Sequence, residues 1–232
     1  MIKYVMVLPY AYRPYFKECI DTKALNLNVL AIDNTHENLG VAESWNRGID
    51  EMKRTDAEWL IVCSAAIRFG DEGGNDLLDQ IEKHPYAHVI HFATKDVEEQ
   101  NYVRGESPGY ADGVLGWHLT AIRRDVIEKV GYFDPNFYPM YFEDIDYDLR
   151  INKAYRDPTW LILPIEATGT TLGHGVALGK VKAPADPLIA YFATKWGRHP
   201  SAAQLGEYEH PFNELDKSVK FFPPAHGRLW ND

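Results

Sequence analysis

The adjacent carboxylates Glu143 and Asp144 have the clearest capacity for chemistry in this sequence. They open a stretch, Glu143 to Ala154, that we expect to be helical, because acidic side chains suit the positive N-terminal end of a helix. A carboxylate held stiffly there can face a cleft and take a proton from a hydroxyl group as a general base. Taken alone, however, the pattern favours the simpler interpretation that these residues stabilise the helix terminus. On a helix Asp146 points about 200° away from Asp144, so we expect it to form an ion pair with Arg150.

A second polar group follows the strand expected over Asn28 to Asp33. The Asp33 carboxylate can accept a hydrogen bond from an N–H or hydroxyl group of a ligand, although Asp33-Asn34 is also a turn-forming pair. Gly40 permits a ligand to approach the backbone closely, or simply begins a helix. In α/β sheets ligands bind beyond the carboxyl ends of strands, which points to Asp33 and to Cys63-Ser64.

A histidine and several basic residues form a third set of candidates. His174 is flanked by glycines in a stretch suited to a loop that closes on phosphate. Protonated, its imidazole would offset negative charge, and neutral, it could ligate a metal. A lone histidine is no metal site, so a loop histidine without function is the alternative. Four basic residues are candidate phosphate contacts: Arg68, Lys180, Lys182 and Arg198. For the last three, a solvated surface charge is the favoured alternative.

Strands and helices must hold these candidate residues in place. Along the sequence, short apolar runs alternate with helix-like stretches, as in βα units. The expected strands are Lys3–Leu8, Asn28–Asp33, Glu58–Cys63, Ala87–Ala93, Gly116–Ile122 and Trp160–Pro164. The expected helices are Tyr15–Leu25, Gly40–Lys53, Leu77–Lys83, Arg124–Val130, Glu143–Ala154 and Pro187–Trp196. A polar, glycine-bearing stretch, Asp96–Gly116, suits a loop or irregular strands over a site. The predicted fold class is α/β with a mostly parallel sheet.

Composition narrows the class of protein. A chain of 232 residues fits one domain with a substantial core, although two small lobes would also fit. The formal net charge of -10 repels phosphate backbones, so duplex nucleic acid is not the expected partner. Two cysteines, Cys19 and Cys63, are too few for a disulfide framework and fit a reducing cytosol. The N-terminal apolar run is too short for a membrane span or a signal peptide. We therefore expect a soluble, cytoplasmic protein.

Six segments occur in a fixed order along about the first 200 residues. They are Val7-Leu8-Pro9-Tyr10, Ile32-Asp33-Asn34, Asn38 to Ile49, Val130-Gly131-Tyr132-Phe133-Asp134 continuing through Phe142-Glu143-Asp144-Ile145-Asp146 to Arg150, Gly173-His174-Gly175, and Tyr191 to Gly197. In this order they resemble the inverting GT-A glycosyltransferases called family 2, particularly the rhamnosyltransferase-like members. The Gly-x-Phe-Asp…Glu-Asp-x-Asp…Arg combination is the most specific of them.

The resemblance implies a GT-A (Rossmann-like) fold over residues 1–200, with a mixed, mostly parallel sheet. Residues 201–232 would be a tail packed on the domain or on a partner. The implied activity is transfer of a sugar, with inversion, from a UDP-, GDP- or dTDP-linked donor to an acceptor hydroxyl. Asp144 would be the catalytic base, and Glu143 would orient the acceptor or the loop.

Other site residues are also carried over by the resemblance. Asp33 would hydrogen-bond the nucleotide base or ribose. The implied donor-binding residues are Pro9, Asp33, Asn38, Gly40, Ser64, Arg68 and His174. The acceptor would meet Tyr110 and Trp117, although packing is the more frequent role of a tryptophan beside a strand.

One departure from the family concerns the metal. The family follows its third strand with an acidic motif that holds Mn²⁺ or Mg²⁺ against the donor diphosphate, whereas this chain has Ala65 and Ala66 there. Alanine offers no oxygen ligand to a hard cation. Three interpretations remain: an enzyme that works without metal, a binding-only relative, or engineered alanines. We favour the first, because Glu143-Asp144 is retained and Arg68 lies beside the gap.

Two rival functions remain at this stage. A non-catalytic module that binds nucleotide sugars or glycans would explain the alanines. A nucleotidyltransferase on a related fold would need a Mg²⁺ site and a basic glycine-rich loop, and neither is evident. The sequence leaves open whether the acceptor is a glycan, a protein, a lipid-linked molecule or a small molecule, and whether the chain forms oligomers.

Overall fold

The computed structural model describes residues 3–10, 19, 29–71, 73–94, 100–101, 114–169, 185–197 and 199–200. The helix expected over Tyr15–Leu25 lies outside the described residues except for Cys19, and so does the expected tail, 201–232. Cys19 and Cys63 are both buried, free thiols. No helix within the described ranges has both the length and the apolar character needed to cross a membrane.

The centre of the molecule is a seven-stranded sheet with the strand order β2-β1-β3-β7-β5-β8-β6. The strands are β1 (Tyr4–Tyr10), β2 (Val29–Asp33), β3 (Trp59–Cys63), β5 (Val89–Thr94), β6 (Gln100–Asn101), β7 (Val114–Arg123) and β8 (Trp160–Ile165). β1 is parallel to β2 and β3, and β5 is parallel to β8. β7 runs antiparallel to β3 and β5, and β6 antiparallel to β8. All the described strands of this sheet except β6 and β7 thus run in the same direction. The sheet is mixed and mostly parallel, as expected.

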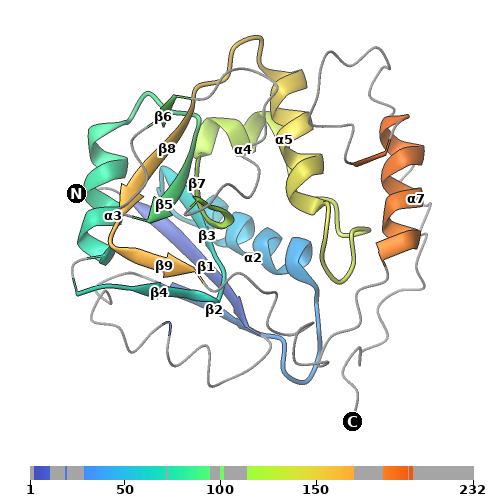
Figure 1. Ribbon diagram of the computed structural model, residues 1–232, viewed down its shortest axis with the longest axis horizontal. Helices are drawn as coiled ribbons and strands as arrows, with labels where there is room; N and C mark the ends of the chain where they lie inside the picture. Colours follow the sequence, from blue (N-terminus) through green and yellow to red (C-terminus); the bar gives the residue numbers. More distant parts are fainter. Residues whose placement is uncertain are drawn as a thin grey trace.

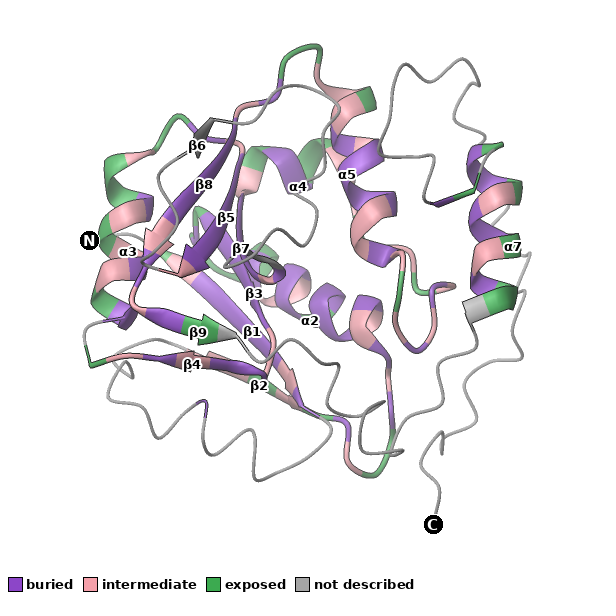
Figure 2. Cartoon of the chain, viewed as in Figure 1, coloured by how far each residue is buried: buried purple, intermediate pink, exposed green. Residues whose placement is uncertain are grey.

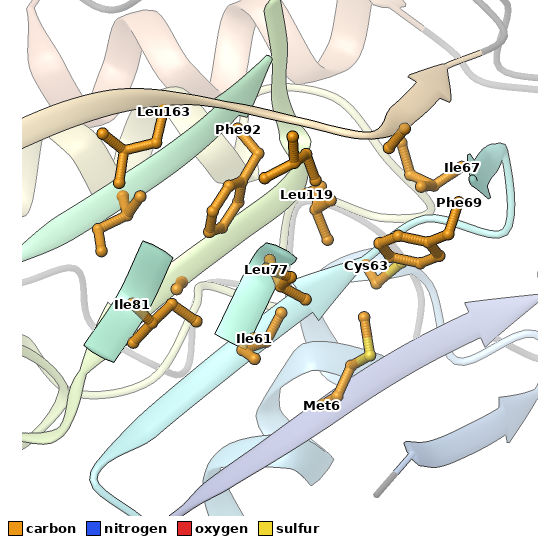
Figure 3. Close-up of a cluster of buried hydrophobic side chains, with 14 of the residues drawn as sticks. Met6, Ile61, Cys63, Ile67, Phe69, Leu77, Ile81, Phe92, Leu119 and Leu163 are labelled. Carbon is orange, nitrogen blue, oxygen red and sulfur yellow. The ribbon is translucent and has the colours of Figure 1, made fainter. Parts of the chain in front are cut away.

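Alternation along the strands builds an apolar layer on each face of the sheet. In β1, Val5 and Val7 pack on one face and Met6 and Leu8 on the other, because successive side chains of a strand point in opposite directions. The Met6 face is covered by α3 (Gly73–Lys83), which inserts Leu77 among the strand side chains (Figure 3). Both faces are thus buried, which explains the almost uninterrupted apolar strands.

The opposite face is covered by α2 (Val41–Arg54), α4 (Arg124–Val130) and α5 (Glu143–Ala154) (Figure 1). The apolar face expected of α2 is present, since Trp45, Ile49 and Met52 are all buried there. This arrangement carries α5, with its acidic first turn, alongside the sheet.

The last described helix is α7 (Ala185–Trp196), and Figure 1 shows it on the far side of α5 from the sheet. Its buried side is apolar and packs on α5 and on the segment before it (Figure 2). This third cluster consists of Phe137, Leu149, Leu188, Tyr191, Phe192 and Trp196. α7 therefore supports α5 from the side opposite the sheet.

The structure differs from the expectation at two places. α3 begins at Gly73 rather than at Leu77, because its first turn contains two buried glycines that carry no helical signal. The strands β4 (Ile67–Phe69) and β9 (Ala167–Gly169) were not expected, and they form a separate antiparallel pair. Each has three residues, too few for alternation to be read along the sequence.

Candidate active site

The backbone before α5 is unusual. Tyr141 and Phe142 have φ angles of 88° and 72°, in the left-handed region that residues with side chains rarely occupy. Each such residue costs about 1–3 kcal/mol and persists only where the surrounding structure holds it. Phe142 is the N-cap of α5 and makes no side-chain capping bond. The expected acidic pair follows directly, so the chain enters α5 through a strained turn.

Glu143 is buried at the start of α5, with only 6% of its surface exposed. Its Oε2 atom is buried and has no hydrogen-bond partner. Burial, and then the negative charge of Asp144, raise the pKa of Glu143 well above its ordinary value. Hydrogen bonds from the backbone N–H groups of Glu143 and Tyr141 lower this pKa, but by less than burial and the charge of Asp144 raise it. Glu143 is therefore the carboxyl group of this pair that holds a proton most tightly.

Asp144 is half-buried and differs from its neighbour in its contacts. Its Oδ1 atom accepts a hydrogen bond of 2.8 Å from the backbone N–H of Ile145. Burial raises the pKa of Asp144, while the N–H groups of Ile145 and Asp144 favour its charged form. Burial thus raises the pKa of both adjacent carboxyl groups, and the charge of Asp144 adds to the effect at Glu143. Two adjacent carboxyl groups with raised pKa values therefore begin α5.

One face of α5 is tied to the sheet through Trp117 of β7. Asp148 lies one helical turn after Asp144 and accepts the indole N–H of Trp117 at 3.2 Å and 3.3 Å. The Trp117 ring packs between Trp45 and Tyr147 and is 7% exposed. The ring therefore packs in the core, which is the second of the two roles considered for it, and it leaves little surface for an acceptor.

The other face of α5 is tied to α7. The expected ion pair between Asp146 and Arg150 is confirmed, with a distance of 3.0 Å between Oδ2 and Nε. Asp146 Oδ1 also accepts from Trp196 Nε1 at 2.9 Å and lies 2.7 Å from Lys195 Nζ. Asp146 therefore points away from the side on which Asp148 meets the sheet, as helix geometry predicts.

Lys195 extends this network to the turn that precedes α5. Its Nζ atom donates to Asp134 Oδ2 at 2.7 Å, and the hydroxyl group of Tyr191 donates to the same oxygen at 2.7 Å. Burial opposes the ionisation of Asp134, but the Lys195 charge and these hydrogen bonds outweigh it and lower its pKa. Asp134 is thus ionised in the network, which fixes the segment 131–142 to α7.

At one edge of the sheet, Asp33 ends β2 opposite Tyr10 of β1. Its Oδ1 atom accepts hydrogen bonds from the backbone N–H and the hydroxyl group of Thr35, so the turn-forming role considered for it is present. Asp33 is exposed and lies at the carboxyl edge of the sheet, where Pro9 is half-buried on the neighbouring strand. This edge is where an α/β sheet binds ligands.

The loop from Asp33 to Gly40 packs on the segment before α5. Gly40 has a φ of 80°, and a Cβ atom there would lie 2.8 Å from Tyr138 Cδ2. The Tyr138 hydroxyl donates to the carbonyl oxygen of Asn38 at 3.0 Å, and the Asn38 side chain accepts the N–H of Gly40 at 2.9 Å. Val41 N–H donates to Pro139 O at 2.8 Å. In this structure, Gly40 allows close approach of Tyr138.

Ser64 and Arg68 lie at the turn between β3 and β4, on either side of Ala65 and Ala66. The Ser64 hydroxyl accepts the N–H of Ala66 at 3.2 Å, and Ser64 N–H donates to His118 O at 2.7 Å. The guanidinium group of Arg68 folds back over the turn, with Nη1 2.7 Å from Ala65 O and 2.9 Å from Ile67 O. A cationic group therefore lies beside the two alanines.

Several candidates fall outside the described residues, namely Tyr110, His174, Lys180, Lys182 and Arg198. Among the residues whose positions are described, no group of three or more histidine, cysteine, aspartate or glutamate side chains could hold a metal ion. Sequence reasoning missed Tyr138, Asp148 and the contacts of Lys195 with both carboxylates. Only Asp148 carried a local signal, because it lies four residues after Asp144.

Comparisons with known proteins bear on the fold. No family model and no curated protein matches the sequence. The crystal structure of S. aureus TarS 1–349 in complex with UDP-GlcNAc superposes with a TM-score of 0.51 and 11% identity, over 85% of this chain and 67% of that one. The fold is of the GT-A type.

Two further crystal structures are similar to the chain at lower scores. S. aureus TarS 1–349 has a TM-score of 0.47 and 12% identity over 70% of this chain. A197 from STIV has a TM-score of 0.47 and 12% identity, over 74% of this chain and 87% of that one. The chain spans 60% of the TarS 1–349 structure. In this fold, Asp33 ends β2 and Ser64 follows β3, and the two strands flank β1 with their carboxyl ends at the same edge of the sheet.

Proposed function

We propose that this chain is an inverting glycosyltransferase that moves a sugar from a nucleoside diphosphate sugar to an acceptor hydroxyl, with Asp144 as the base. The observation that carries the proposal is the acidic pair at the start of α5. The pKa of both carboxyl groups is raised, Glu143 has a buried oxygen without a hydrogen-bond partner, and both residues follow two left-handed residues. Perturbed carboxyl pairs on a strained backbone are typical of catalytic sites.

The proposed reaction is a single displacement. An oxygen of Asp144 takes the proton of the acceptor hydroxyl as the acceptor oxygen attacks the anomeric carbon. The bond from that carbon to the diphosphate oxygen breaks, and the diphosphate leaves with the bonding electrons. Because attack and departure occur on opposite faces, the configuration inverts. Glu143, holding its proton, contributes a hydrogen bond and adds no second negative charge.

The donor is proposed to bind at the carboxyl edge, where Asp33 ends β2 and Ser64 follows β3. TarS was solved with UDP-GlcNAc, so UDP sugars are the first donors to test. We propose that Pro9, Asn38 and Gly40 shape this side of the donor site, with His174 closing on the diphosphate. Because Asn38 and Gly40 contact Tyr138, donor binding would also act on the segment before Asp144.

The leaving diphosphate needs positive charge, and Arg68 is our candidate for part of it. Its guanidinium group lies against the turn that would otherwise carry metal-binding carboxylates. A fixed cation can stabilise developing charge without a metal. The proposed enzyme is thus independent of Mn²⁺ and Mg²⁺. The two alanines equally favour a second candidate, a binding-only relative that holds the nucleotide sugar without turning it over.

Calorimetric titration with UDP-, GDP- and dTDP-sugars, each with Mn²⁺ and with EDTA, tests these proposals. We expect one donor class to bind equally well with EDTA, and Arg68→Gln to weaken that binding while Arg54→Gln does not. Arg54 is exposed at the end of α2 and serves as the matched control. Binding that requires Mn²⁺ would overturn the metal-free mechanism. Donor binding with no turnover or donor hydrolysis would favour the binding-only relative.

A further inference from the structure

Three large aromatic side chains are exposed in the described part of the chain: Tyr86, Tyr132 and Tyr141. The Tyr132 ring is covered by Lys53 Nζ, 3.8 Å from its centroid, and its hydroxyl group donates to Asp50 at 2.7 Å. Tyr86 lies edge-on to His84. Tyr141 is 40% exposed and lies two residues before Glu143, beside the proposed reaction centre.

The position of Tyr141 is fixed by its neighbours. Phe142 packs against Phe192 of α7, with ring centroids 6.0 Å apart, and thereby anchors the turn. The Tyr141 ring is tilted against the Phe142 ring at 6.3 Å and keeps its exposure. A strained, left-handed backbone that holds a large apolar ring at the surface is an arrangement that folding alone does not favour.

Glu143 supplies a second and independent observation. Its Oε2 atom is buried without a hydrogen-bond partner, although buried polar atoms are almost always paired. Its carboxyl group interacts with the backbone N–H of Tyr141, which brings the two residues to the same turn. A ligand group that hydrogen-bonds Oε2 would remove this deficit.

We propose that Tyr141 and Glu143 form the acceptor subsite for a neutral pyranose, and this inference rests on the proposed function. The C–H face of the sugar stacks on the Tyr141 ring, and one hydroxyl group pairs with Glu143 Oε2. A neighbouring hydroxyl group is then presented to Asp144. A phosphorylated or carboxylated sugar is disfavoured, because the ionised Asp144 repels it. The proposed acceptor is thereby a neutral glycoside, and a peptide hydroxyl is the competing class.

Saturation-transfer NMR with neutral methyl pyranosides tests the subsite without requiring turnover. The probes are the methyl glycosides of glucose, galactose, rhamnose and N-acetylglucosamine, with a serine-containing peptide as the competing class. We expect at least one pyranoside to receive saturation on the C–H protons of one face. Tyr141→Ala should weaken its binding by about threefold to tenfold. Tyr141→Phe should retain it, and Tyr132→Ala is the matched control for loss of an exposed tyrosine.

Several outcomes would overturn the subsite. They are undiminished pyranoside binding by Tyr141→Ala, binding of the peptide in place of every pyranoside, or no pyranoside binding by the wild-type protein. Tyr141→Leu is the second variant, since it keeps an apolar side chain without a ring and should also lose binding. Donor titration in parallel separates the two proposals. Donor binding and turnover without a pyranoside subsite would overturn this inference alone, whereas the absence of any donor binding would contradict the proposed function.

Discussion

The ammonium group of Lys195 lies 2.7 Å from a carboxylate oxygen of Asp146, and both side chains are almost completely buried. The same ammonium group lies 2.7 Å from Asp134, so one lysine on α7 neutralises carboxylates on α5 and on the turn before it. The Lys195 ammonium group thus links α7 to α5 and to the turn that precedes α5. α7 therefore helps to hold α5, the helix that begins with the proposed base, in position. α7 itself supplies no proposed catalytic group.

Replacing Lys195 with methionine should lower the free energy of unfolding by about 3–5 kcal/mol, because the buried Asp134 carboxylate loses its cation and Asp146 is left with Arg150. Denaturant titration measures the change. Arg54→Met is the control, since Arg54 and Glu51 form an exposed pair whose loss should cost less than about 1 kcal/mol. Equal losses for the two variants would show that the buried network contributes no more than a surface pair.

Glu143 predicts a pH dependence of stability. Because its pKa is raised in the folded protein, its favourable contribution is complete below its unfolded value of about 4.3 and is lost as pH rises through the folded pKa. Glu143→Gln cannot ionise, so its stability relative to wild type should increase with pH across that window. Thermal unfolding of both proteins between about pH 4 and pH 8 measures this. A constant difference would contradict the raised pKa.

Asp144→Asn should reduce turnover about a hundredfold to ten-thousandfold, because the acceptor proton loses its base. Donor affinity should stay largely unchanged, since Asp144 is not among the proposed donor-binding residues. Asp79→Asn on α3, across the sheet, is the matched control and should leave turnover unaltered. Initial rates and donor titrations on the three proteins are the measurements, and full activity of Asp144→Asn would assign the base elsewhere.

Gly40→Ala should destabilise the protein more than Gly131→Ala. Both glycines have positive φ angles, of 80° and 88°, so each substitution strains the backbone by about 1–3 kcal/mol. Only at Gly40 would the new Cβ atom also meet Tyr138, because nothing lies within 4 Å at Gly131. Chemical denaturation gives the free energy of unfolding of both variants, and the difference between their losses is the cost of the contact with Tyr138. Similar losses would mean that the Tyr138 ring moves aside at little cost.

Much of the fold could be predicted from the sequence, because local patterns generate it. The apolar run Trp59–Cys63 and the spacing of Trp45, Ile49 and Met52 predicted a buried strand and a helix, and both are present. The Asp146–Arg150 pair followed from four-residue spacing on a helix. The turn at Asp33 likewise depends only on its nearest neighbours.

Tertiary structure alone decided which of these elements meet around the acidic pair. Lys195 and Asp134 are 61 residues apart, and Tyr138 and Asn38 are 100 apart. Such contacts leave no periodicity in a sequence, because they depend on how whole helices pack against the sheet and against each other. The same packing placed Trp117 in the core beside Asp148 and left Tyr141 exposed. The sequence thus determined that Glu143 and Asp144 begin a helix, and the packing of α5 determined how deeply each is buried and which carboxyl group keeps its proton.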